Sequence, residues 1–236
     1  MEFTTTRYQT LSRKVTEQDR KMLQQLGYTE QHVIESVFTS SLKPQTEHVT
    51  RKEVGIPENK FAMIVVGFRL DDEVSDEFLR MLEEILTEDM CMVYVGTFRL
   101  FEKRMEKYPK LKRVSLYLGE CQDVLSRMEL CDLYLNPRRK GGGTSSVEAL
   151  FKGVPVVSQN YGDVSVNVGE EFCVKDYEEM QGKILRYYKD NKYYQEMSHK
   201  AIKRAERLLD TDKEFINIIN EVYKREEERL MRCEEE

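Results

Sequence analysis

The residues best suited to chemistry in this 236-residue chain form one glycine-rich stretch, residues 136–150. It reads NPRRKGGGTSSVEAL: a basic turn, three glycines, three hydroxyl residues and a glutamate. Glycines let a ligand approach the backbone closely, and hydroxyl residues are favoured at a helix N-cap. A helix N-terminus offers free N–H groups and partial positive charge, which suits a phosphate. The stretch therefore predicts a cradle for a nucleotide diphosphate.

Two common phosphate-binding signatures do not fit the sequence. The three glycines are followed by Thr-Ser-Ser and no lysine, so the stretch is not a P-loop. The first predicted strand is followed by Gly67-Phe68-Arg69-Leu70, which lacks the GxGxxG pattern of dinucleotide-binding folds. A different kind of nucleotide site is expected.

The elements that must position this stretch alternate regularly from Phe61 onward. Short apolar runs predict six strands, each with a glycine near its end or just after it: 62–66, 92–95, 114–118, 133–135, 154–158 and 172–174. Between them, helical spacing predicts helices at 74–86, 98–108 and 123–130, and a further helix that opens at the glycines. This alternation is typical of a doubly wound parallel sheet. Ligands of such sheets bind at the carboxyl ends of the strands, where Gly67, Gly96, Gly119 and the triple glycine are expected.

Three regions are predicted around this sheet: a helical lead-in at 1–57, a Rossmann-like domain at 58–190 and C-terminal helices at 191–236. Residues 50–53 have the spacing of a capping box. Residues 33–38 could form a short strand or a docking segment. The lead-in is either a surface extension or the tail of an upstream domain, and the sequence does not decide between them.

Composition excludes several classes of function. The formal net charge of -6 argues against broad nucleic-acid binding as the main task. The five cysteines form no CxxC pair, which predicts reduced thiols and a cytoplasmic location, and the three histidines are too dispersed for a metal site. The start of the chain lacks the apolar core of a signal peptide, and the longest apolar run, 61–68, is too short to span a bilayer.

Four runs of residues carry a resemblance to a known family. They are VVGFRL at 65–70, YLG at 117–119 with DVL at 123–125, CDLYLNP at 131–137, and GGGTSSVEAL at 141–150 with GVPVV at 153–157. Together they resemble the carboxy-terminal, donor-binding domain of GT-B glycosyltransferases. Residues 49–57 resemble the interdomain segment that precedes that domain. The resemblance implies a Rossmann-like GT-B half that binds a nucleotide-diphosphate sugar, with UDP-sugars favoured.

The resemblance also implies roles for individual residues. Glu148 would accept hydrogen bonds from the ribose hydroxyls, or it could merely stabilise the start of a helix. Arg69 would clamp a phosphate, or it could be a surface arginine paired with Asp71 or Asp72. The diphosphate would lie on glycine amides and hydroxyls, and the base on the end of the third strand. The other residues in these roles are Gly67, Gly119, Glu120, Gly142, Gly143, Thr144 and Ser145.

Two departures from the family pattern leave the chemistry open. Many retaining members have a second glutamate where this chain has Lys140, which, with Arg138 and Arg139, could supply positive charge instead. The usual lysine after the arginine of the first strand is replaced by acidic residues at 71–73. Tyr161-Gly162-Asp163 could face the sugar or form an ordinary turn. Neither the catalytic residues nor the stereochemical outcome is assigned.

The function expected from the sequence is that of the donor-binding domain of a glycosyltransferase. It would need an N-terminal domain or a partner subunit, or associate with itself, and it would use no cofactor or metal beyond its nucleotide sugar. The alternatives are a non-catalytic nucleotide-binding partner that regulates a glycosyltransferase, and a protein of the nucleotide-sugar epimerase type.

Overall fold

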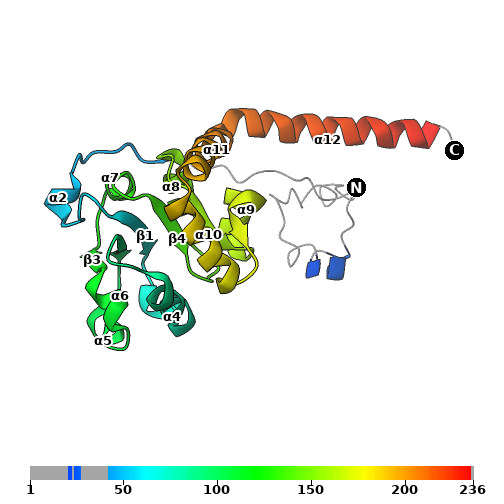
Figure 1. Cartoon of the computed structure of the whole chain (residues 1–236). Helices are drawn as coiled ribbons and strands as arrows, with labels where there is room; N and C mark the ends of the chain where they lie inside the picture. Colours follow the sequence, from blue (N-terminus) through cyan, green and yellow to red (C-terminus); the bar gives the residue numbers. More distant parts are fainter. Residues whose placement is uncertain (1–20, 23, 28–41, 235–236) are drawn as a thin grey trace. The chain divides into compact units, whose positions relative to one another are not determined.

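A computed structural model describes residues 21–22, 24–27 and 42–234 (Figure 1). Residues 42–206 form one compact unit, and the residues from Arg207 onward belong to a second one. Most of the predicted lead-in, including residues 33–38, lies outside the described residues. The domain boundaries predicted at 57 and 190 stay predictions.

The first unit is built on six parallel strands in the order β3-β2-β1-β4-β5-β6. This confirms the predicted doubly wound parallel sheet. The strands are mostly buried apolar segments, as a sheet covered on both faces requires. Their bounds are β1 Phe61–Gly67, β2 Met90–Gly96, β3 Ser115–Gly119, β4 Leu133–Asn136, β5 Val156–Gln159 and β6 Cys173–Val174.

The helices cover the sheet in two groups, which Figure 1 shows around the strands. In one group α4 contacts both α6 and α10, and in the other α8 contacts both α7 and α9. A short α2 precedes the sheet and begins with the predicted capping box between Thr50 and Glu53. The bounds in this unit are α2 Arg51–Val54, α3 Leu70–Glu73, α4 Asp76–Ile85, α5 Phe101–Met105, α6 Pro109–Arg113, α7 Val124–Met128, α8 Gly143–Phe151, α9 Gly162–Val168, η3 Glu170–Phe172 and α10 Tyr177–Lys189.

The strand order reverses between β1 and β4, which are neighbours in the sheet. At such a switch point the loops after the two strands diverge to opposite faces and leave room for a ligand. Gly67, Gly96 and Gly119 end β1, β2 and β3, as predicted, and the triple glycine follows β4. The glycine-rich stretch therefore lies beside the switch point.

One predicted helix differs from the structure. The helix expected at 98–108 is shorter in the structure, where α5 covers Phe101–Met105, and Pro109 begins a further helix, α6. Proline suits the first position of a helix because it needs no partner for a missing N–H and its φ is already helical.

The tyrosine-rich segment after Asp176 forms helices. The rings of Tyr187 and Tyr193 have centroids 4.9 Å apart, and Tyr187 is buried. Helix α11, Asn191–Leu209, follows α10, and α12, Thr211–Glu234, continues it. On α12 the apolar side chains of Phe215, Ile216 and Tyr223 are exposed.

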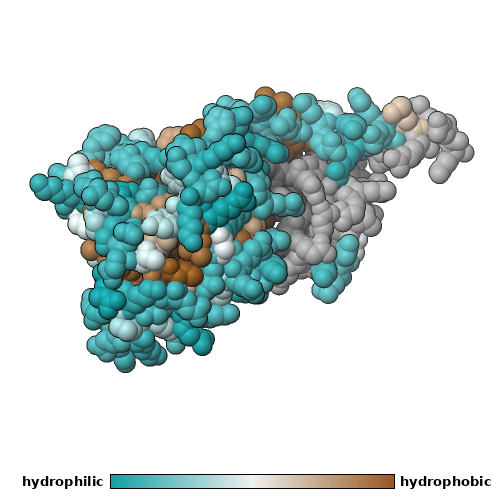
Figure 2. Space-filling view, in the orientation of Figure 1, coloured by the Kyte–Doolittle hydropathy of each residue, from teal (hydrophilic) through white to brown (hydrophobic). Residues whose placement is uncertain are grey.

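The visible surface is mostly hydrophilic, with small brown apolar clusters (Figure 2). No helix among the described residues is long and apolar enough to cross a membrane. The cysteines Cys91, Cys121 and Cys131 are free.

Candidate nucleotide-sugar site

The turn between β4 and α8 differs from the expectation in how the helix begins. The N-cap is Gly142 with φ 103, and no side chain caps the helix. Thr144 and Ser145 lie inside its first turn instead, with Thr144 exposed. The hydroxyl N-cap was therefore wrong, and Glu148, the sixth residue of the helix, lies in the second turn rather than the first. The first backbone N–H groups of α8 have no side-chain cap, which is the arrangement that suits an anion.

Arg139 holds this turn from beneath. Its side chain is only 3% exposed and forms an ion pair with Glu73 at 2.6 Å. Its Nε donates to Asn136 Oδ1 at 2.7 Å, and its Nη2 donates to the Val66 carbonyl at 2.7 Å and to the Tyr134 hydroxyl at 3.0 Å. A buried charge is tolerated only when it is paired and hydrogen-bonded in this way. Arg139 thus ties the end of β1 to the turn after β4 and does not supply charge to a ligand.

The guanidinium group of Arg139 also explains why glycine is needed nearby. A Cβ on Gly142 would lie 2.7 Å from Asn136 Oδ1 and 2.8 Å from Arg139 Nη2. A Cβ on Gly67 would collide with the same guanidinium group. Gly142 in addition has a positive φ, which side-chain-bearing residues rarely adopt. Gly141 is different, because its nearest neighbour would be Arg69 Nη2 at 4.0 Å.

Arg69 lies on the solvent side of the same turn. Its side chain is 71% exposed and pairs with Glu73 at 3.1 Å, and not with the predicted Asp71 or Asp72. Asp71 instead accepts hydrogen bonds from the backbone N–H groups of Arg99 and Leu100. The Glu73 carboxylate is therefore shared between a buried and an exposed arginine. Arg69 is an accessible cation beside Gly141.

Helix α9, which follows β5, closes the other side of the turn. The Asp163 N–H donates to the Lys140 carbonyl at 3.1 Å, and a Cβ on Gly162 would lie 2.8 Å from that oxygen. A Cβ on Gly143 would meet Asn167 Nδ2 at 3.0 Å and Asp163 Cβ at 3.5 Å. This close packing explains the glycines at 143 and 162. Helix α9 was not predicted, because Tyr161-Gly162-Asp163 reads as a turn.

Glu148 projects from α8 toward the β3 side of the sheet. Burial raises its pKa to about 7, a hydrogen bond from Ser145 opposes that rise, and the charge of Asp123 adds to it. Asp123 caps α7, which packs against α8. Glu148 is thus a half-buried carboxyl group poised to ionise near neutral pH.

The end of β3 presents Gly119 and Glu120 next to the end of β2. Glu120 accepts a hydrogen bond from Thr97 Oγ1 at 2.6 Å and is exposed. The Tyr117 hydroxyl donates to the Gly96 carbonyl at 2.9 Å, which joins the two strand ends. This edge therefore offers mainly backbone and one carboxylate, as the predicted base-binding region would.

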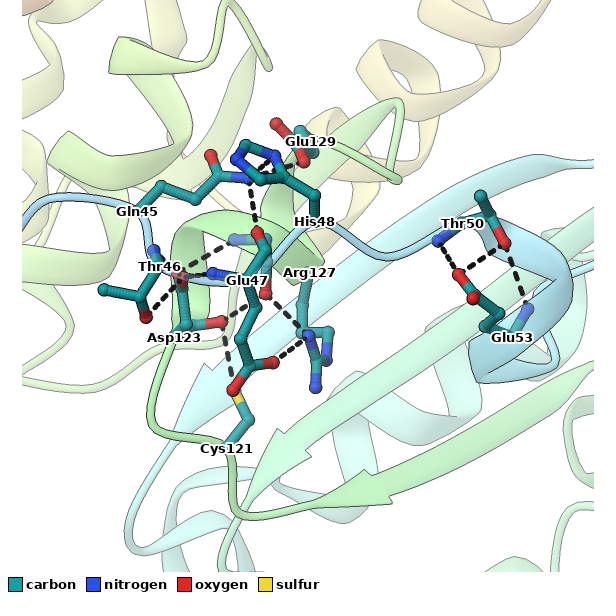
Figure 3. A network of polar contacts seen from close by, with 11 residues as sticks. Gln45, Thr46, Glu47, His48, Thr50, Glu53, Cys121, Asp123, Arg127 and Glu129 are labelled. Atoms are coloured by element: carbon teal, nitrogen blue, oxygen red, sulfur yellow. Dashed lines mark hydrogen bonds and ion pairs between the residues drawn. The ribbon is translucent and has the colours of Figure 1, made fainter.

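Residues 45–48 lie across the start of α7, as Figure 3 shows. The carboxylate of Asp123 accepts hydrogen bonds from the N–H groups of Thr46 at 2.6 Å, Glu47 at 2.8 Å and Ser126 at 3.1 Å. Burial alone would raise the pKa of Asp123, but these hydrogen bonds outweigh it and lower the pKa. Arg127 completes the contact by an ion pair with Glu47 at 2.8 Å. Asp123 therefore fixes both α7 and the segment before the sheet.

Two further cations border the site, Arg138 and Lys140, and both are exposed. The Arg138 guanidinium lies 4.7 Å from the centroid of the Tyr161 ring and donates to Gln159 Oε1 at 3.4 Å. Because Arg139 points inward between them, the basic run divides into one buried and two exposed side chains.

The structure thus groups the predicted site residues in two places. At the switch point lie Gly67, Arg69, Lys140, Gly142, Gly143, Thr144 and Ser145. At the β3 side lie Gly119 and Glu120, with Glu148 on α8 directed toward them. Sequence reasoning missed Glu73, Asn136 and Asp123 as supports of the site. Only Asp123 had a readable signal, since an aspartate before an apolar helical run is a common N-cap.

The fold and the site together define a Rossmann-like GT-B half. A family model described as glycosyl transferases group 1 matches residues 47–205, and the chain belongs to this family. No curated protein sequence matches the chain.

Solved structures of similar fold include glycosyltransferases with nucleotides bound. A TarM mutant from S. aureus, in complex with UDP among other ligands, has a TM-score of 0.65 at 16% identity over 88% of this chain and 43% of its own. Anabaena Alr3699/HepE in complex with UDP-glucose has a TM-score of 0.66 at 15% identity over 92% and 65%. A GtfA/B complex has a TM-score of 0.61 at 16% identity over 89% and 45%. The chain therefore spans less than two thirds of each of these structures.

Proposed function

We propose that this chain is the donor-binding domain of a glycosyltransferase and binds a nucleotide-diphosphate sugar, with UDP as the favoured nucleotide. The observation that carries the proposal is the turn before α8. Its helix start has no side-chain cap, Gly142 is packed against Arg139, and the exposed Arg69 lies beside it. Backbone N–H groups and an accessible guanidinium are the partners that a diphosphate needs.

In this arrangement the nucleotide lies along the carboxyl edge of the sheet. The diphosphate contacts the amides and hydroxyls of residues 142–145, and Arg69 and Lys140 contribute positive charge. Glu148, once ionised, accepts hydrogen bonds from the ribose hydroxyls. The base lies toward Gly119 and Glu120. Support of the leaving diphosphate would be the contribution of this chain to glycosyl transfer.

The proposal includes a second domain or subunit that supplies the acceptor site and the catalytic base. The chain spans 43% of the TarM structure and 45% of the GtfA/B structure. That one of these neighbours is a complex supports a partner subunit, and self-association is the other route. The free cysteines support a reducing compartment such as the cytoplasm.

Calorimetric titration with UDP and GDP tests the proposal directly. The wild-type chain is expected to bind UDP, and Glu148→Ala to bind it at least about tenfold more weakly, because hydrogen bonds to a charged acceptor are lost. Asp89→Ala, at an exposed position at the amino end of β2, is the control and is expected to bind as wild type does. Absence of binding of either nucleotide at millimolar concentration would refute the proposal.

A further inference from the structure

The direction in which a nucleotide sugar would lie on this chain follows from two fixed points. Glu148 faces the β3 side, where Asp123 and Cys121 are close enough to interact with it electrostatically. The glycine turn at 142–143 lies at the start of the same helix. If the ribose is at Glu148 and the diphosphate at the turn, the group beyond the diphosphate continues away from β3. The next element on that side is α9, which follows β5.

Asp163, in the first turn of α9, is the acidic residue that lies against the glycine turn. Its Cβ lies 3.5 Å from the position of a Cβ on Gly143, and its N–H is fixed to the Lys140 carbonyl at 3.1 Å. Two further contacts fix α9. Asn167 Nδ2 donates to the Gly143 carbonyl at 3.3 Å, and Arg204 Nε donates to the Asn167 carbonyl at 2.7 Å. The backbone of Asp163 is thus held at a constant distance from the turn.

The carboxylate of Asp163, in contrast to its backbone, is available. The residue is exposed, and among the described residues no hydrogen bond or ion pair engages its side chain. A negative charge beside a diphosphate site does not help to bind phosphate. A carboxylate does, however, accept pairs of hydrogen bonds from neighbouring sugar hydroxyls or from an amino group.

We propose that Asp163 recognises the sugar of the donor and accepts hydrogen bonds from its hydroxyl or amino groups. This inference rests on the proposed function of the chain as a donor-binding domain. It assigns Asp163 a role in sugar selection that is separate from the nucleotide contacts of Glu148 and the glycine turn. The sugar-binding side chain would come from the start of α9, and the nucleotide-binding side chains from elements nearer the switch point.

Asp163→Asn separates sugar recognition from nucleotide binding. It keeps the size of the side chain but removes the charge and one acceptor. Calorimetry would compare UDP with UDP-glucose, UDP-galactose and UDP-N-acetylglucosamine for the wild type, Asp163→Asn and Asp89→Asn. Asp89 is an exposed aspartate at the opposite edge of the sheet and serves as the matched control. Urea unfolding of each variant would show that the fold is kept.

The expected result is a change in the ratio of the dissociation constant for a UDP-sugar to that for UDP. An equal change in both constants is not expected. For Asp163→Asn, UDP binds within about threefold of wild type or slightly more tightly, because only a screened surface charge is removed. At least one UDP-sugar loses about tenfold in affinity relative to UDP, because hydrogen bonds to a charged acceptor are lost. Asp89→Asn leaves the ratio unchanged.

Two outcomes would overturn the inference, and they are distinguishable. If wild type binds UDP but the ratio is the same in Asp163→Asn for every sugar tested, Asp163 does not recognise the sugar and the proposed function stands. If wild type binds neither UDP nor any UDP-sugar, the proposed function fails and the inference falls with it.

Discussion

The loop after β1 and the turn after β4 each place an arginine against Glu73, and the two arginines differ in every other respect. Arg139 is 3% exposed and donates to three further groups, whereas Arg69 is 71% exposed and has Glu73 as its partner. The contrast shows how one carboxylate can serve two tasks. It neutralises a buried charge that shapes the site, and it holds a second charge where a ligand can reach it.

The buried arginine is expected to matter most for stability. Arg139→Met leaves the carboxylate of Glu73 without its strongest partner and removes the hydrogen bonds to Val66, Asn136 and Tyr134. We expect a loss of about 3–5 kcal/mol in the free energy of unfolding, measured with urea. The double variant Glu73→Gln with Arg139→Met should lose less than the two single variants together. Strict additivity would show that the two side chains are not coupled.

Substitution of Gly142 is expected to have the next largest effect on stability. Gly142→Ala introduces a Cβ at a positive φ and against Arg139 and Asn136, and should cost about 2 kcal/mol of stability. It should also weaken UDP binding, since the helix start shifts. Gly141→Ala is the matched control, because its Cβ would meet only Arg69 Nη2 at 4.0 Å. Equal effects of the two substitutions would mean that the packing around Gly142 is not what sets the turn.

Glu148 should make both stability and binding depend on pH. Its folded pKa of about 7 is above the ordinary value of 4.5, so the folded chain holds a proton that the unfolded chain has released. Stability attributable to Glu148 is therefore highest below about pH 4.5 and falls as the pH rises to about 7, by on the order of 1–3 kcal/mol. Glu148→Gln removes this dependence, which unfolding curves at pH 5.5 and 8 would detect by the difference between wild type and variant.

Ionisation of Glu148, which lowers the stability of the fold, should strengthen the binding of UDP. Because the ionised carboxylate accepts ribose hydrogen bonds best, UDP affinity should rise between pH 6 and 8 in the wild type. It should vary less in Glu148→Gln. A wild-type affinity that is constant across this range would contradict the assignment of Glu148 to the ribose.

The exposed arginine should show the smallest effect on stability. Arg69→Ala removes a surface ion pair and should change the free energy of unfolding by less than about 1 kcal/mol. Its UDP affinity should nevertheless fall by about tenfold, because a charged hydrogen-bond partner of the diphosphate is lost. Calorimetry and urea unfolding on the same preparation would show the contrast. If Arg69→Ala instead lowered the free energy of unfolding and kept the affinity for UDP, Arg69 would be a structural residue and not a ligand-binding one.

The sequence was sufficient for the sheet but not for the interior of the site. Apolar runs such as 62–66 predict buried strands because burial on both faces needs continuous apolar residues. The glycines at strand ends could also be found, since a turn beside a ligand favours glycine. The burial of Arg139 could not, because it depends on Glu73 and on the Val66 carbonyl, which are distant in sequence. Its neighbours Arg138 and Lys140 are equally basic and are exposed, so composition alone does not single it out.

Helix starts show the same limit on a smaller scale. The hydroxyl residues at 144–146 are of the types favoured at an N-cap. The N-cap is nevertheless Gly142, because the close approach of Asn136 and Arg139 requires glycine there. Helix α9 was missed because Gly162 and Asp163 are typical of turns, and its position depends on contacts with Lys140 and Gly143. Local preferences give way where tertiary contacts fix the backbone.

The central claim is that a nucleotide diphosphate binds on the amides before and within the first turn of α8. Backbone amide exchange with and without UDP tests it most directly. We predict slower exchange at residues 142–146 when UDP is present, with little change at Thr87–Asp89 on the opposite edge of the sheet. Unchanged exchange at 142–146 together with protection elsewhere would contradict the account.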